Sequence, residues 1–168
     1  NFILSSPDGN YTLKLKGQIQ VRWTLNSANN QQTEWGFENR RTKLYFEGNI
    51  VDPSWAYRVK MVFNPVTRDA RLEEAWIRKD LGCLADGLDG ATLRVGAFKA
   101  PWLREEQVSS ANQLAVDRSV VNQYFSQGYG KGIELAYATN EWRVTGWYGN
   151  GLNSDSIGYG AANDTRWN

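Results

Sequence analysis

Apolar and polar residues alternate along much of this chain. In residues 11–23, which read YTLKLKGQIQVRW, apolar residues and one glycine occupy the odd positions, and cations or amides occupy the even positions from Lys14 to Arg22. Successive side chains of a β-strand point to opposite faces of its sheet. The segment therefore predicts a strand with one apolar face and one basic face.

The same period of two residues returns in six further segments, which are residues 41–50, 55–64, 71–81, 91–98, 129–137 and 142–149. In residues 71–81 the expected register places Ala75 and Ile77 on the apolar face, with Glu74, Trp76 and Arg78 on the polar face. A helical period is found only near residues 103–115. The sequence predicts an all-β chain of seven strands, with the beginning of an eighth at residues 165–167.

The predicted connections differ in length in a regular way. Long connections at residues 24–35, at 99–128 and after 150 alternate with shorter ones at 51–54 and 138–141, and only the turn near 80–90 departs from this order. Short turns at one end and long loops at the other are typical of antiparallel transmembrane β-barrels.

Charge is sorted between the two predicted faces, although the whole chain has 19 Lys and Arg against 18 Asp and Glu. The predicted polar face holds Glu47, Glu74 and Glu134 together with nine cations, which are Lys14, Lys16, Arg22, Arg41, Lys43, Arg58, Lys60, Arg94 and Arg143. Most of the other carboxylates, including Glu105, Glu106 and Asp117, fall in predicted turns and loops. A cationic lining inside a water-filled tube attracts anions. We therefore interpret the apolar face as facing lipid and the basic face as facing an aqueous lumen.

Aromatic residues at or near the predicted strand ends fit the same interpretation, because transmembrane barrels carry aromatic girdles at both membrane interfaces. These residues are Tyr11, Trp23, Trp55, Phe63, Tyr129, Tyr137, Trp142 and Tyr148. The alternative is a soluble carbohydrate-binding β-domain that uses exposed Trp and Tyr to stack on sugars. A barrel would require detergent, whereas that domain would stay in solution and bind glycans.

The residue types present argue against an enzyme. The chain has no His, which excludes Ser-His-Asp triads and His-containing zinc sites, and its single Cys cannot form an internal disulfide. The acidic pairs Glu73-Glu74 and Glu105-Glu106 are adjacent, so in a regular strand they would point to opposite faces and could not act together as glycosidase carboxylates. No cofactor and no nucleic-acid partner are expected.

Several segments resemble the phosphate-selective porin O/P family of bacterial outer-membrane proteins, over about residues 11 to 152. They include RRTKLYFEGNI, WAYRVKMVFN and, most specifically, VGAFKAP at residues 95–101 followed by Asp117-Arg118-Ser119. The resemblance implies an antiparallel transmembrane β-barrel of about 16 strands, a number that encloses an aqueous channel. Residues 1–168 would then be the N-terminal portion, a partial porin domain covering about half of that barrel.

The resemblance also implies a function and a site. Residues 99–128 would be a loop that folds inward and brings Lys99, Arg104 and Arg118 towards the constriction, while the wall of the path would carry Lys43, Arg58, Lys60, Arg94 and Arg143. The implied solutes are small anions such as phosphate, and the implied surroundings are outer-membrane lipid and a homotrimer. Two alternatives stay open. Glu105 and Glu106 would repel phosphate if they faced inward, and any single wall charge could serve only to pair across strands.

Overall fold

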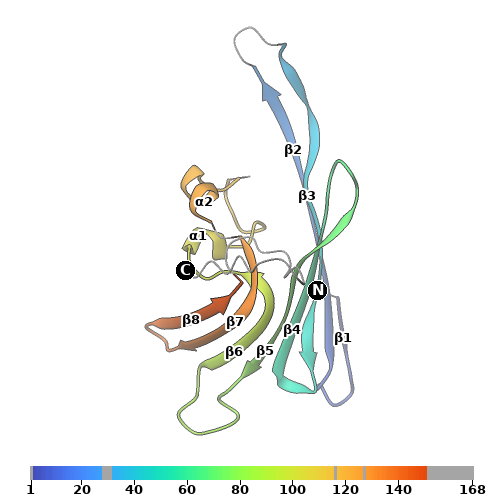
Figure 1. The fold of residues 1–168 in the computed structure, drawn as a ribbon. Helices are drawn as coiled ribbons and strands as arrows, with labels where there is room; N and C mark the ends of the chain where they lie inside the picture. Colours follow the sequence, from blue (N-terminus) through green and yellow to red (C-terminus); the bar gives the residue numbers. More distant parts are fainter. Residues whose placement is uncertain (1, 28–31, 116, 127, 151–168) are drawn as a thin grey trace, which may run out of the picture.

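The chain forms one open antiparallel sheet in a computed structural model that describes residues 2–27, 32–115, 117–126 and 128–150 (Figure 1). Its eight described strands lie in sequence order, and each pairs with the next. They are β1 (Phe2–Ser5), β2 (Thr12–Asn26), β3 (Glu34–Ile50), β4 (Asp52–Phe63), β5 (Ala70–Asp80), β6 (Ala91–Lys99), β7 (Tyr129–Ala138) and β8 (Arg143–Gly149). The predicted all-β antiparallel fold is confirmed.

The seven predicted segments correspond to β2 to β8. Strand β1 was not predicted, because its four exposed residues are too few to show an alternating pattern. Near the predicted helical region the chain forms two short helices, α1 (Arg104–Gln107) and α2 (Val120–Phe125). The strand expected at residues 165–167 lies outside the described residues.

The prediction of a long loop at residues 24–35 is wrong, because β2 and β3 continue as a hairpin that projects from one end of the sheet (Figure 1). A register shift between Gln20 and Val21 leaves Arg40 as an extra residue in β3. This bulge moves the outward-facing residues of β3 from even positions, such as Phe46, to odd positions, such as Phe37. The change of phase concealed the first part of β3 from the sequence pattern.

A second bulge lies in β5. Lys60 is paired with Glu74 and Met61 with Leu72, which leaves Glu73 as the extra residue. Glu73 and Glu74 therefore both contact Lys60, on the polar face of the sheet. The expectation that these adjacent carboxylates point to opposite faces is wrong here, since a bulge suspends the alternation. The predicted outward register of Ala75 and Ile77 holds, because they pair with Val59 and Tyr57.

Burial in this sheet is reversed relative to a soluble protein. Among the described residues, buried polar side chains such as Lys60 and Glu134 outnumber buried apolar ones, and Phe98 is the only large side chain that is fully buried. On the opposite face, Ile19 is 76% exposed and Val144 is 60% exposed. A soluble sandwich would cover such an apolar face with a second layer.

The connections separate to the two ends of the sheet. Strands β2, β4 and β6 run towards one end of the sheet, where β3, β5 and β7 begin, and residues 6–11, Val51, 81–90 and 139–142 connect strands at the other end (Figure 1). The segment of residues 100–128, hereafter the loop, contains both helices. None of the helices in the described residues is long and apolar enough to cross a membrane.

The sheet is strongly curved from β5 to β8 (Figure 1). Gly96 on β6 lies between Trp76 of β5 and Gly132 of β7, and its φ is +133°. A Cβ atom at Gly96 would overlap the carbonyl oxygen of Ala75. This position of β6 therefore requires glycine, because its φ is positive and a Cβ would have no room beside β5.

Candidate functional site

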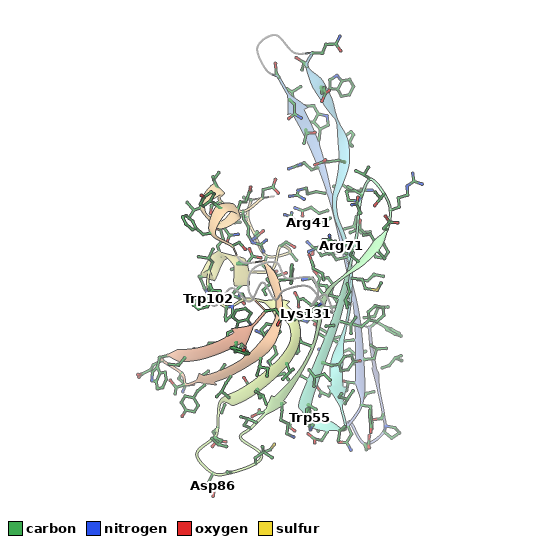
Figure 2. The ribbon with its side chains drawn as sticks, in the orientation of Figure 1. Arg41, Trp55, Arg71, Asp86, Trp102 and Lys131 are labelled. Carbon is green, nitrogen blue, oxygen red and sulfur yellow. The ribbon has the colours of Figure 1, made fainter. Side chains whose placement is uncertain are left out.

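The loop lies over the polar face of the sheet. Gln18 of β2 donates a hydrogen bond to Ser110 of the loop at 3.2 Å, and the Lys99 ammonium donates to the carbonyl oxygen of Glu106 at 2.7 Å. Figure 2 shows side chains, among them Arg41, that extend from the strands towards the loop. Residues far apart in the sequence therefore form one site.

Asp117 attaches the loop to β2 and β3. Its carboxylate oxygens lie 2.6 Å from Arg22 Nη1 and 2.6 Å from Arg40 Nη2, and Arg41 Nη2 lies 3.4 Å away. The bulge at Arg40 lets two consecutive arginines reach this one carboxylate. Burial alone would raise the pKa of Asp117, but the hydrogen bond from Arg40 and the attraction of the three arginines hold that pKa below its ordinary value.

The two glutamates of α1 hold the loop together. Glu106 is buried and accepts a hydrogen bond from Asn122 at 2.8 Å, with Lys99 Nζ at 3.3 Å and Arg118 Nε at 3.4 Å. These partners outweigh burial and lower the pKa of Glu106. Glu105 accepts hydrogen bonds from the hydroxyl and backbone N–H of Ser119 at 2.6 and 2.7 Å, which lower its pKa.

A cavity of about 320 Å³, which we call the central cavity, lies between the loop and the sheet. Seven cations and three carboxylates line it. The cations are Arg41, Lys43, Arg58, Lys60, Arg94, Lys99 and Arg118, and the carboxylates are Glu73, Glu74 and Glu106. Cations therefore outnumber carboxylates among the lining residues, although each of these cations has a carboxylate within 4 Å.

Lys60 is at the centre of a dense network. Its ammonium lies 2.9 Å from Glu73, contacts Glu74, and donates a hydrogen bond to the Tyr129 hydroxyl at 2.9 Å. Glu73 also lies 2.8 Å from Lys43 Nζ. Two lysines and two glutamates therefore share one largely buried region, where each charge requires a partner.

The wall arginines are oriented by carboxylates and by an indole. Arg58 lies 2.9 Å from Glu47, and Arg94 lies 2.6 Å from Glu134. Both guanidinium groups lie over the ring of Trp76, at 5.3 and 5.6 Å from its centroid. Stacking and ion pairing together restrict where these donors can point.

The structure brings six of the eight predicted site residues together at the central cavity, namely Lys43, Arg58, Lys60, Arg94, Lys99 and Arg118. Arg104 and Arg143 line a neighbouring cavity together with Arg94. The expectation that the loop carboxylates lie away from the basic face is wrong for Glu106 and Asp117, because the loop folds back onto that face.

The predicted site left out Arg40, Glu73, Arg78 and Tyr129, although Arg78 was placed on the polar face. Tyr129 was expected in an outer aromatic girdle, but its hydroxyl accepts a hydrogen bond from Lys60. It pairs with Lys99 and is the first residue of β7, where the loop ends. The breaks in alternation at Arg40-Arg41 and Glu73-Glu74 indicate bulges, and they could have identified Arg40 and Glu73.

Comparison with known proteins agrees with this architecture. Residues 13–168 match the family model described as phosphate-selective porin O and P. A search of curated proteins gave no match. The family match covers most of the chain and implies a channel rather than an enzyme. The chain therefore belongs to the phosphate-selective porin O and P family.

Proposed function

We propose that this protein is a passive channel for small anions such as phosphate, and that the polar face of the sheet lines its aqueous path. Family membership supports an outer-membrane channel of the phosphate-selective class. The residues that attract the solute, the inward role of the loop, the surrounding bacterial outer-membrane lipid and assembly as a homotrimer are parts of the proposal.

The excess of cations at the central cavity is the observation that carries the proposal. Seven cations face three carboxylates there, behind a sheet whose other face is apolar and exposed. Low-dielectric walls focus the field of such a surplus and raise the local concentration of anions. Guanidinium and ammonium groups also donate hydrogen bonds suited to oxyanions.

The ion pairs in the cavity are compatible with anion passage. Buried cations that lacked partners would lose their charge or destabilise the wall. The carboxylates keep closely spaced cations charged and fixed in position, and the remaining surplus stays positive. An anion would then move past preoriented donors without binding so tightly that it could not leave.

The experiment is a measurement of ion selectivity with the purified protein in planar lipid bilayers under a salt gradient. The triple variant Arg58→Gln, Lys60→Gln and Arg94→Gln is expected to shift the reversal potential towards cation selectivity. The control variant Arg68→Gln removes a cation from the exposed connection between β4 and β5 and is expected to leave the reversal potential unchanged. An unchanged reversal potential in the triple variant would contradict the proposal.

A further inference from the structure

A second cavity, of about 400 Å³, lies beside the central cavity. Strands β5, β6, β7 and β8 and the beginning of the loop form its walls. We call it the arginine cavity, because it is lined by the guanidinium-bearing residues Arg78, Arg94, Arg104 and Arg143 and by Glu134 as its one carboxylate.

Charge in the arginine cavity is not balanced. Arg94 and Arg143 share Glu134, at 2.6 and 3.7 Å. Arg78 lies directly opposite Arg94 on the neighbouring strand, and like charges in that position repel each other. Within the part of the chain that the structure describes, neither Arg78 nor Arg104 forms an ion pair. Every cation that lines the central cavity, in contrast, has a carboxylate within 4 Å.

One wall of the arginine cavity is apolar. Pro101, Trp102 and Leu103 line it. Trp102 is 53% exposed, and its ring meets Trp147 edge to face with centroids 6.4 Å apart, so the indole is supported from one side and accessible from another. Figure 2 shows Trp102 at the part of the loop that lies next to strands β7 and β8. The cavity thus combines unpaired guanidinium groups with an accessible aromatic ring.

We infer that the arginine cavity binds an organic carboxylate that has a flat apolar body. Arg78 and Arg104 hold the carboxylate group, for which the guanidinium fork is well matched, and the apolar body lies against Trp102. Inorganic phosphate would satisfy the arginines but leave the Trp102 wall uncovered. The inference rests on the proposed function, because the cavity must open onto the aqueous path.

The test uses benzoate, acetate and phosphate as probes, with single-channel conductance measured against the concentration of each anion. Benzoate is expected to half-saturate the wild-type channel at about a tenfold lower concentration than acetate. The double variant Arg78→Gln and Arg104→Gln is expected to raise the half-saturating concentration of both carboxylates about tenfold. Trp102→Ala is expected to raise the value for benzoate and to leave those for acetate and phosphate within about twofold. The control variant Arg68→Gln is expected to change none of them.

The outcomes separate this inference from the proposed function. Equal half-saturation by benzoate and acetate in the wild-type channel, or an equal effect of Trp102→Ala on both, would overturn the inference while anion conduction itself persisted. A wild-type channel that conducted no anions would overturn both proposals. Because the decisive comparison uses the wild-type protein, a variant that failed to fold would not prevent the test.

Discussion

At the scale of single residues, carboxylates determine how much of the positive charge on the polar face is left uncompensated. Glu73 lies within 3 Å of both Lys43 and Lys60, and Asp117 lies 2.6 Å from both Arg22 and Arg40. In each case a β-bulge has placed two like charges that are adjacent in the sequence on the same face, namely Glu73-Glu74 and Arg40-Arg41. In the proposed channel, the surplus of cations over these shared carboxylates would set the electric field that a solute meets.

Removal of one shared carboxylate should strengthen anion selectivity. We expect Glu73→Gln to raise the ratio of anion to cation permeability, because Lys43 and Lys60 would lose part of their compensation. Thermal stability should fall at the same time, since a broken buried ion pair costs about 3–5 kcal/mol. Reversal potentials and a gel-shift melting curve measure the two effects. Glu141→Gln, in the exposed turn between β7 and β8, is the control, and a lower anion preference in Glu73→Gln would refute the expectation.

The attachment of the loop should depend on pH in the direction set by Asp117. Because its pKa in the folded protein is below the ordinary value of 3.8, the stabilisation is complete above that value and is lost as the pH falls through the folded pKa. A spin label at Ala111→Cys, in a Cys83→Ser background, should stay immobile from pH 7 down to about pH 4. It should become mobile in stronger acid.

In Asp117→Asn the same label should be mobile already at pH 7, because the arginines of β2 and β3 would face an uncharged amide. Equal immobility of the label in both proteins at pH 7 would show that other contacts, such as Gln18 with Ser110, are sufficient to hold the loop.

At the scale of elements, alternation predicts strands well wherever one face meets water and the other does not. It failed at Arg40 and Glu73, because one extra residue resets the period and reverses the side to which later residues point. The contacts of the loop could not be predicted either. Asp117 contacts Arg22 at a sequence separation of 95, and no local pattern encodes such a pairing.

Gly96 gives a direct test of the curved part of the sheet. We expect Gly96→Ala to destabilise the protein, because its φ of +133° costs a non-glycine residue about 1–3 kcal/mol and the added Cβ would overlap Ala75. Gly17→Ala is the matched control, since the nearest atoms to a Cβ there are 3.9 Å away. The temperature at which the folded band disappears from an unheated gel series measures both. Equal midpoints would refute the role of Gly96.

At the scale of the whole molecule, the two faces of one sheet have opposite character. Its outer face presents exposed apolar side chains such as Ile19, Phe37 and Val144, and its inner face holds buried charges under the loop. Sequence patterning predicted this division and placed Arg41, Lys43, Arg58, Lys60 and Arg94 on the polar face, while Lys99 and Arg118 were implied by the family resemblance. It did not predict how completely the cations there are paired, because the partners come from bulges and from the loop.

The proposed function requires that hydrocarbon contacts the apolar face while water fills the polar side. Spin labels at adjacent positions test it most directly, in a Cys83→Ser protein reconstituted in lipid bilayers, with Ile19 and Val144 as outward sites and Gln18 and Thr145 as inward sites. We expect outward labels to collide frequently with oxygen and rarely with a water-soluble nickel chelate, and we expect inward labels to show the reverse. Equal accessibility of adjacent sites to the nickel chelate would contradict it.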